Sequence, residues 1–233
     1  MSPLVFAVLL TLTGASVSSL LTSCTTAQVS EADPAALYKD AEDDIKNDHY
    51  QIAIDKLRSI RNKFPYSKYA VDAQLRLADV YFLQEDFAEA AAAYETFRDL
   101  HPKHEKAPYA MFRIGKSYFK DSPTNVARDL TPAQKSVDAY QDYLRRYPNA
   151  TDAQEARNDL EAARGLLASK ELYIGNFYFK RDFYDSAKPR FQRVISNYPE
   201  SSAATEAKEK LEKISDYEAK HPHAEKKGSD QNG

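Results

Sequence analysis

The sequence predicts an all-α fold in which helical hairpins stack into a solenoid. The first observation is a repeated dipeptide, an aromatic residue or His followed by Pro, which occurs at Phe64-Pro65, His101-Pro102, Tyr147-Pro148 and Tyr198-Pro199. The second is an alanine both five and eight residues after every one of these prolines: Ala70, Ala73, Ala107, Ala110, Ala153, Ala156, Ala204 and Ala207. The third is a small residue twelve positions before each proline: Ala53, Ala90, Ser136 and Ala187. A period of this length is typical of stacked helical pairs, and it favours a binding scaffold over an enzyme.

The residues inside each copy follow one order. In the third copy this order is Ile114, Gly115, Tyr118, Ser136, Tyr140, Tyr143 and Pro148. The order is that of the tetratricopeptide repeat (TPR), in which a small residue lets two helices approach to about 8–10 Å. Alanine should be tolerated in place of Gly115 or Gly175, since Ala78 fills the same position in the second copy. The predicted fold is a right-handed superhelical solenoid of about four TPR hairpins plus a C-terminal helix.

Composition agrees with a helical scaffold. The chain has 233 residues, of which 6 are Gly, and a formal net charge of −3 from 32 basic and 35 acidic residues. This balance gives no support for nucleic-acid binding. His101 and His104 have a spacing that metal ligands use, but they flank a Pro turn and have no second ligand pair, so no metal site is expected.

The first residues of the chain read as a signal for export. Residues 3–21 are apolar or small and carry no charge, and Leu21-Thr22-Ser23-Cys24 follows at once. This sequence resembles the bacterial lipobox, in which the cysteine receives a lipid and becomes the mature N-terminus. We therefore expect a signal peptide over residues 1–23 and lipidation at Cys24, the only cysteine of the chain. The alternative is an ordinary signal peptide with an incidental cysteine.

The remaining boundaries come from polarity and capping signals. Residues 24–33 are polar and read as a flexible tether. Helices should start at Pro34, with Asp33 as N-cap. The TPR domain is expected over residues 34–219, and the polar residues 220–233 read as a disordered tail.

Two spacings depart from the period. An insertion over residues 120–131 precedes Thr131-Pro132, which reads as an N-cap followed by a first-turn proline. The segment after Pro148 is longer than its counterparts and predicts a single helix from about Thr151 to Phe179, roughly 40–45 Å long. We expect this helix to offer a docking face for a partner protein. Its candidate docking residues are Arg157, Arg164, Lys170 and Glu171.

A second candidate surface is a peptide groove lined by the first helices of the early hairpins. Counting from the packed small residues places nine side chains on it: Tyr38, Glu42, Ile45, Leu75, Asp79, Phe82, Phe112, Lys116 and Phe119. Their aromatic rings could hold an extended peptide. The alternative is that these rings pack between hairpins, because aromatic residues at helical spacing are usually core residues.

Several motifs together resemble one family. A lipobox, a tether and TPR hairpins are accompanied by Arg128-Asp129-x-Thr131-Pro132 and by the long helix leading to Tyr173-x-x-Gly175-x-Phe177-Tyr178. From Cys24 to about Ile214 the chain resembles the BamD (ComL/YfiO) family of outer-membrane assembly lipoproteins. Family members from enteric bacteria have a complete fifth hairpin, whereas here we expect one helix after Pro199.

The resemblance implies a lipid-anchored scaffold on the periplasmic face of the outer membrane of a Gram-negative bacterium. The implied partners are a BamA-like barrel protein with POTRA domains, other assembly lipoproteins and unfolded outer-membrane β-barrel proteins. It implies no enzymatic activity and no cofactor apart from the lipid on Cys24. The alternative is another TPR lipoprotein, such as a pilotin that brings a secretin to the outer membrane. A cell-wall enzyme would need a catalytic constellation, and the sequence contains no Gly-x-Ser-x-Gly, no His-Glu-x-x-His and no Gly-rich phosphate loop.

Overall fold

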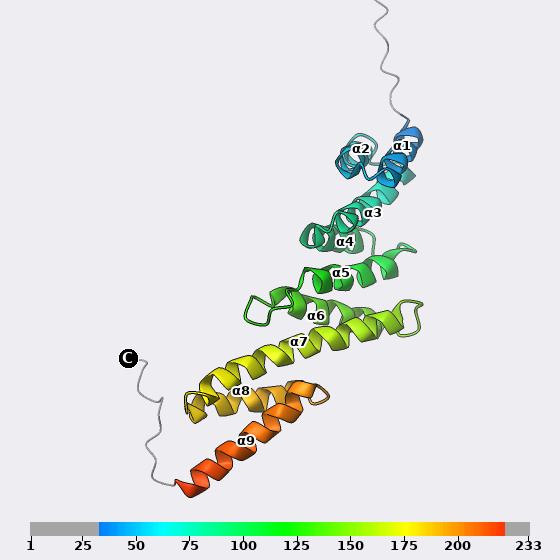
Figure 1. Cartoon of the computed structure of the whole chain (residues 1–233). Coiled ribbons are helices and arrows are strands. Elements are labelled where there is room, and N and C mark those ends of the chain that lie inside the picture. Colours follow the sequence, from blue (N-terminus) through cyan, green and yellow to red (C-terminus); the bar gives the residue numbers. More distant parts are fainter. Residues whose placement is uncertain (1–32, 222–233) are drawn as a thin grey trace, which may run out of the picture. The chain divides into compact units, whose positions relative to one another are not determined.

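The computed structural model describes residues 33–221, which form nine α-helices and no strand (Figure 1). In chain order they are α1 (Pro34–Lys46), α2 (Tyr50–Lys63), α3 (Lys68–Leu83), α4 (Phe87–Leu100), α5 (Ala107–Asp121), α6 (Thr131–Arg146), α7 (Ala153–Phe179), α8 (Tyr184–Asn197) and α9 (Ser202–Lys220). The all-α fold of TPR hairpins is confirmed. The signal peptide, Cys24, most of the tether and most of the tail lie outside the described residues.

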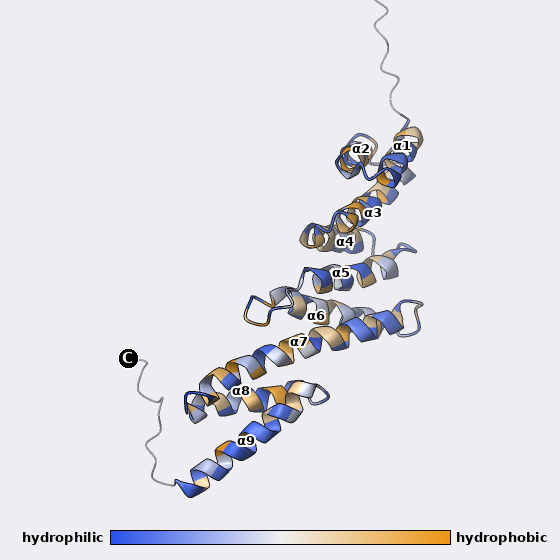
Figure 2. Ribbon diagram, viewed as in Figure 1, coloured by the Kyte–Doolittle hydropathy of each residue, from blue (hydrophilic) through white to orange (hydrophobic). Residues whose placement is uncertain are grey.

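The helices stack in the order of the chain. Each helix packs against the helix before it and the helix after it. The odd-numbered helices also contact one another along the stack: α1 with α3, α3 with α5, α5 with α7, and α7 with α9. Four hairpins result, α1/α2, α3/α4, α5/α6 and α7/α8, followed by α9 alone. Figure 2 shows α9 as mainly hydrophilic, and its buried residues are limited to Ala203, Ala204, Ala207 and Ile214. In the described part of the chain, α9 therefore gives the stack a polar end.

The two glycines predicted at helix contacts lie against aromatic rings of the facing helix. A Cβ atom added to Gly115 would stand 2.7 Å from Cδ1 of Tyr140, and one added to Gly175 would stand 2.6 Å from Cε1 of Phe191. Both rings are fully buried. The predicted close approach is confirmed. Even one methyl group would overlap a ring that has little room to move, so the contact geometry opposes the expectation that alanine is tolerated.

One turn ends the second helix of every hairpin. The amides of Phe64, His101, Tyr147 and Tyr198 each donate to the carbonyl four residues earlier, at 2.8–2.9 Å, and Pro follows. Proline has no amide hydrogen and cannot continue the ladder, so the helix stops there. The turn inside three hairpins instead uses a residue with positive φ: Asp48 (59°), Glu85 (64°) and Asp182 (61°).

The third hairpin has the predicted insertion in place of that turn. The helix after it begins at Thr131, as expected, but Thr131 is not its cap. The carboxylate of Asp129 accepts hydrogen bonds from the Thr131 amide at 3.0 Å and from the Thr131 hydroxyl at 2.8 Å. Asp129 therefore holds the start of α6, and Leu130 is buried beneath it.

Four apolar clusters run along the stack, and each odd-numbered helix inside it is shared by two of them. In α5, Ala110 and Ile114 belong to the cluster with α3 and α4, while Met111 and Phe112 belong to the cluster with α6 and α7. The two sets interleave within the same turns. In α7 they are consecutive: Ala156 and Leu160 pack toward α5 and α6, and the set from Ala168 onward packs toward α8 and α9.

Candidate functional site

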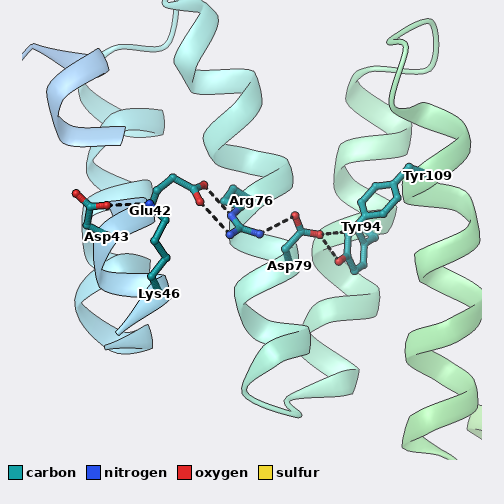
Figure 3. Close-up of polar contacts among 7 residues, drawn as sticks. All are labelled: Glu42, Asp43, Lys46, Arg76, Asp79, Tyr94 and Tyr109. Atoms are coloured by element: carbon teal, nitrogen blue, oxygen red, sulfur yellow. Dashed lines mark hydrogen bonds and ion pairs between the residues drawn. The ribbon is translucent and has the colours of Figure 1, made fainter. Parts of the chain in front are cut away.

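A chain of polar contacts crosses the first three odd-numbered helices (Figure 3). It begins at α1, where the Glu42 carboxylate accepts hydrogen bonds from Arg76 Nε at 2.7 Å and from a second Arg76 nitrogen at 3.0 Å. Both side chains are about one quarter exposed. A two-point contact of this kind fixes both the distance and the orientation of its partners, so it sets how α1 lies on α3.

Asp79 is the centre of the next contact. Its Oδ1 accepts hydrogen bonds from the Tyr94 hydroxyl at 2.5 Å and from the Tyr109 hydroxyl at 2.8 Å, and Arg76 lies 3.5 Å from Oδ2. Burial and the negative charge of Asp79 raise the pKa of Tyr109 to about 12 and raise that of Tyr94 further. Asp79 thereby joins α3 to α4 and α5.

Arg113 extends these contacts on α5. Its Nε donates to the Tyr94 hydroxyl at 3.1 Å, and its guanidinium lies 3.7 Å from the centre of the Phe82 ring. A guanidinium over an aromatic face is attracted by the negative face of the ring. Arg113 therefore covers one face of the Phe82 ring.

Lys116 carries the contacts on to α7. Its Nζ lies 2.7 Å from both Glu155 Oε1 and Asp159 Oδ2, and Asp159 also accepts a hydrogen bond from the Tyr140 hydroxyl at 2.7 Å. Burial alone would lower the pKa of Lys116, but the hydrogen bonds to the two carboxylates raise it. The lysine is thus held charged between α5 and α7.

Three of these contacts share one register. In each, one partner directly follows the small residue at a helix contact, which is Ala78, Gly115 or Gly175. The other partner directly precedes the second repeated alanine of the next odd-numbered helix, which is Ala110, Ala156 or Ala207. The pairs are Asp79 with Tyr109 at 2.8 Å, Lys116 with Glu155 at 2.7 Å and Asn176 with Glu206 at 3.0 Å. We call the contacts from Glu42 to Glu206 the polar ladder. Its members differ in residue type, so no sequence identity between copies marks it.

The residues predicted to line the peptide groove divide into three groups. Ile45, Leu75 and Phe112 are at most 6% exposed and belong to the apolar clusters, so their placement in an open groove is corrected. Tyr38, Phe82 and Phe119 pack against clusters while partly exposed. The polar members, Glu42, Asp79 and Lys116, belong to the ladder. The early groove therefore offers paired charges, and most of its apolar side chains pack between hairpins.

The four charges predicted for docking on α7 all have partners within the chain. Three of them donate to a backbone carbonyl: Arg157 to Pro148 at 2.7 Å, Arg164 to Asn197 at 2.6 Å and Lys170 to Arg128 at 2.6 Å. Glu171 accepts from Arg190 at 3.1 Å. These charges tie α7 to neighbouring turns and to α8. Sequence spacing could not show this, because three of the partners are main-chain carbonyls and the fourth, Arg190, lies on another helix.

Sequence reasoning missed a pair of exposed rings on the same helix. Tyr173 and Phe177 lie one helical turn apart on α7 and are 51% and 45% exposed. The Arg181 guanidinium lies 3.7 Å from the centre of the Phe177 ring. The signal that could have found them is their four-residue spacing at positions that the repeat pattern does not use for packing.

Two hollows repeat between consecutive hairpins. One of about 320 Å³ is bounded by α2, α3 and α4, and one of about 370 Å³ is bounded by α4, α5 and α6. Tyr81 and Tyr118 occupy the same position in their copies and line the two hollows. The Tyr81 hydroxyl accepts from Arg58, whereas the Tyr118 hydroxyl donates to Glu95. The two hollows thus lie at the same place in their repeats and differ in the charges that line them.

Between residues 33 and 221, no cluster of three or more His, Cys, Asp or Glu side chains is arranged to hold a metal ion. His101 instead lies 3.0 Å from the side-chain oxygen of Gln74. No helix in this part of the chain is both long and apolar enough to span a membrane.

Comparison with known proteins shows the family to which the chain is similar. The profile of the family described as "YfiO: Outer membrane lipoprotein" matches residues 30–231. The chain is 29% identical over 210 residues to the outer membrane protein assembly factor BamD of Vibrio cholerae, covering 85% of this chain and 87% of that protein. It is 28% identical to the protein of that name from Neisseria meningitidis and 29% identical to the one from Caulobacter vibrioides. These two alignments cover 70% and 73% of this chain, and 64% and 56% of the relatives.

Proposed function

Because the chain belongs to the YfiO family of outer membrane lipoproteins, we propose that it is a scaffold of the machinery that assembles β-barrel proteins in the outer membrane. It binds the POTRA region of a BamA-like barrel protein, and it binds unfolded outer-membrane proteins on their way to insertion. Other assembly lipoproteins attach to the same scaffold. The protein performs no chemistry of its own and needs no cofactor beyond its lipid.

The observation that carries this proposal is the family match over residues 30–231, which spans all four hairpins and α9. Relatives named as outer membrane protein assembly factors align over most of the chain. A stack of hairpins offers an extended surface, and such surfaces are used to hold other proteins. The polar ladder supports the scaffold role, because it fixes each hairpin on the next without using a ligand.

The anchor in this proposal is the lipid on Cys24. Acyl chains contribute about 0.8 kcal/mol per buried CH₂, and one chain alone binds a membrane only weakly, so a multiply acylated cysteine gives a stable anchor. Thr25 follows Cys24. Enteric lipoproteins that stay in the inner membrane usually have Asp at this position, so we propose sorting to the outer membrane.

The surface proposed for the barrel partner is the outer face of α7 around Tyr173 and Phe177. Exposed aromatic rings are frequent anchors of protein interfaces. Arg157, Arg164, Lys170 and Glu171 lie along the same helix, and an arginine that donates one hydrogen bond keeps other N–H groups for a partner. These charges then set the orientation of the partner and the rate of association.

Affinity purification from detergent-solubilised envelopes tests the function. Recovery of a POTRA-bearing barrel protein with the tagged lipoprotein supports the proposal. Recovery of a secretin in its place assigns the protein to the pilotins, and recovery of neither partner contradicts both assignments.

A further inference from the structure

Gly165 differs from the other two glycines of the helical stack. Gly115 and Gly175 lie against buried rings, and any side chain would overlap those rings. Around Gly165, by contrast, a Cβ atom would meet nothing within 4 Å. Glycine inside a helix is destabilising by roughly 0.5–1 kcal/mol relative to alanine, because it has more conformational freedom to lose. Packing does not require a glycine here, so another property must explain it.

Gly165 lies between the two halves of α7. Leu160 and the residues before it pack toward α5 and α6, whereas Ala168 and the residues after it pack toward α8 and α9. Residues 161–167, about two helical turns, belong to neither cluster, although Ala163 in this stretch is fully buried. In α3 and α5 the corresponding sets interleave, whereas in α7 the two clusters are separated by this stretch, in which Gly165 and the residues beside it are half-buried.

The C-terminal hairpin reaches the rest of the stack through α7. Extensive packing connects α8 and α9 only with α7 and with each other. A bend in the middle of α7 would therefore move α8 and α9 as one body and leave both apolar clusters intact. Sharp changes of helix direction are common at glycine, and hinges are formed by a few residues that absorb a change of φ and ψ.

Two side chains cross this point in opposite directions. Arg164 lies just before Gly165, and it donates at 2.6 Å to the carbonyl of Asn197, which ends α8. Its guanidinium also lies 5.3 Å from the centre of the Tyr198 ring. Lys170 lies after Gly165, and it donates at 2.6 Å to the carbonyl of Arg128 in the insertion before α6. Each contact joins one half of α7 to the body that packs on the other half.

We propose that Gly165 is a hinge between two bodies, residues 34–160 and residues 168–220, and that Arg164 and Lys170 are its latches. While both latches are closed, α7 stays straight and the bodies keep one orientation. When a latch opens, α7 bends at Gly165 and the C-terminal body reorients. The insertion before α6 supplies the Arg128 carbonyl that Lys170 binds, so the insertion is part of one latch.

A matched control exists on the same helix. Arg157 also donates to a backbone carbonyl, that of Pro148, at 2.7 Å. Both groups lie on the N-terminal side of Gly165, so this contact does not cross the hinge. Removing it takes away one arginine–carbonyl hydrogen bond from α7 and leaves both latches in place.

Distance measurements between spin labels test the hinge. The full chain is prepared as Cys24→Ser, which removes its only cysteine, with labels on Lys63→Cys in α2 and Lys213→Cys in α9. Both positions are exposed. We expect the distance distribution to broaden or shift in Arg164→Met and Lys170→Met and to stay unchanged in Arg157→Met. Adding Gly165→Ala to either latch variant should narrow the distribution again.

The outcomes separate a hinge from local unfolding. Broadening that Gly165→Ala reverses, with unchanged helical content by circular dichroism, supports the proposal. An unchanged distribution in both latch variants overturns it. So does broadening that Gly165→Ala does not reverse, and so does broadening accompanied by a loss of helicity, because the C-terminal body would then have unfolded.

Discussion

The Tyr140 hydroxyl donates to Asp159 at 2.7 Å, and through this bond the second helix of the third hairpin is attached to the first helix of the fourth. The same carboxylate oxygen lies 2.7 Å from Lys116. The ring of Tyr140 lies against Gly115 at the hairpin contact. One side chain thus combines the packing inside a hairpin with the polar ladder between hairpins, and alkaline pH should reveal this coupling.

The free energy of unfolding should decrease with pH above about 10, where tyrosine in the unfolded chain begins to lose its proton. Burial and the negative charge of Asp159 raise the pKa of Tyr140 above that value, so the folded chain keeps the proton for longer. The contribution of Tyr140 to the free energy of unfolding is therefore fully present below pH 10 and is lost as the pH rises toward the pKa in the folded chain. One proton of difference gives a slope of about 1.4 kcal/mol per pH unit.

Urea unfolding at several pH values from 9 to 11 gives the slope of the free energy of unfolding against pH, and this slope is compared between wild type and Tyr140→Phe. We expect a shallower slope in the variant. The fully exposed Tyr66 supplies the control, since Tyr66→Phe should keep the wild-type slope. Equal slopes in all three proteins would show that Tyr140 ionises as it does in the unfolded chain.

Alanine at the two packed glycines should destabilise the protein. Gly115→Ala and Gly175→Ala should each reduce the free energy of unfolding by about 1–3 kcal/mol, because the new methyl group overlaps a buried ring. Gly165→Ala is the control: it meets no atom and should increase stability by up to about 1 kcal/mol. Thermal and urea unfolding measure all three. A stabilising effect at position 115 or 175 would contradict the contact geometry.

The lysine of the ladder allows a test of how exposure affects ion pairs. Lys116 lies 2.7 Å from both acids, but the Glu155 side chain is 53% exposed and that of Asp159 is 14% exposed. Double-mutant cycles of Lys116→Met with Glu155→Gln and with Asp159→Asn should give a coupling below about 1 kcal/mol for Glu155 and a larger one for Asp159. The reverse ranking would show that the distance, and not the burial, determines the energy of these pairs.

The repeat pattern predicted the helices well, because their packing is local in sequence. The small residue at 115, the ring at 140 and the proline at 148 recur at fixed spacing, so the contact of Gly115 with Tyr140 followed from position alone. The long helix followed in the same way, from a surplus of residues without proline. The predicted start at about Thr151 lies close to the observed Ala153.

The candidate sites were predicted less well, for a physical reason. Arg157, Arg164 and Lys170 looked free because sequence patterns do not show backbone carbonyls, yet all three donate to carbonyls. Leu75 and Phe112 were placed in the groove from helical phase, but each packs against the second helix of its own hairpin and the first helix of the next hairpin. The apolar stripe of a first helix is therefore wider than one face suggests. Tyr173 and Phe177 are exposed because neighbouring helices leave about half of each side chain uncovered, and this can be seen only in the structure.

Lipidation should place the mature N-terminus at Cys24. Intact mass of the protein purified from membranes should equal residues 24–233 plus a lipid, and Cys24→Ala should move the protein from the membrane fraction to the soluble periplasmic fraction. Cys24→Ser should behave in the same way, because only a thiol accepts the thioether-linked diacylglycerol. A mass that places the N-terminus elsewhere, or that lacks the lipid, would contradict the anchor.

Capture of the barrel partner should depend on the exposed rings of α7. Replacing Tyr173 and Phe177 together by Ala should weaken capture about tenfold or more, because a truncated aromatic anchor commonly costs at least 2 kcal/mol of binding energy. Melting should change little, since both rings are about half exposed. Arg157→Glu and Arg164→Glu should also weaken capture, but each removes a hydrogen bond to a carbonyl, so their melting temperatures must be measured beside their binding. Phe82→Ala, in the early groove, is the control and should spare the partner. If Phe82→Ala abolishes capture while the α7 variants retain it, the barrel partner docks on the early hairpins and the α7 surface serves another protein.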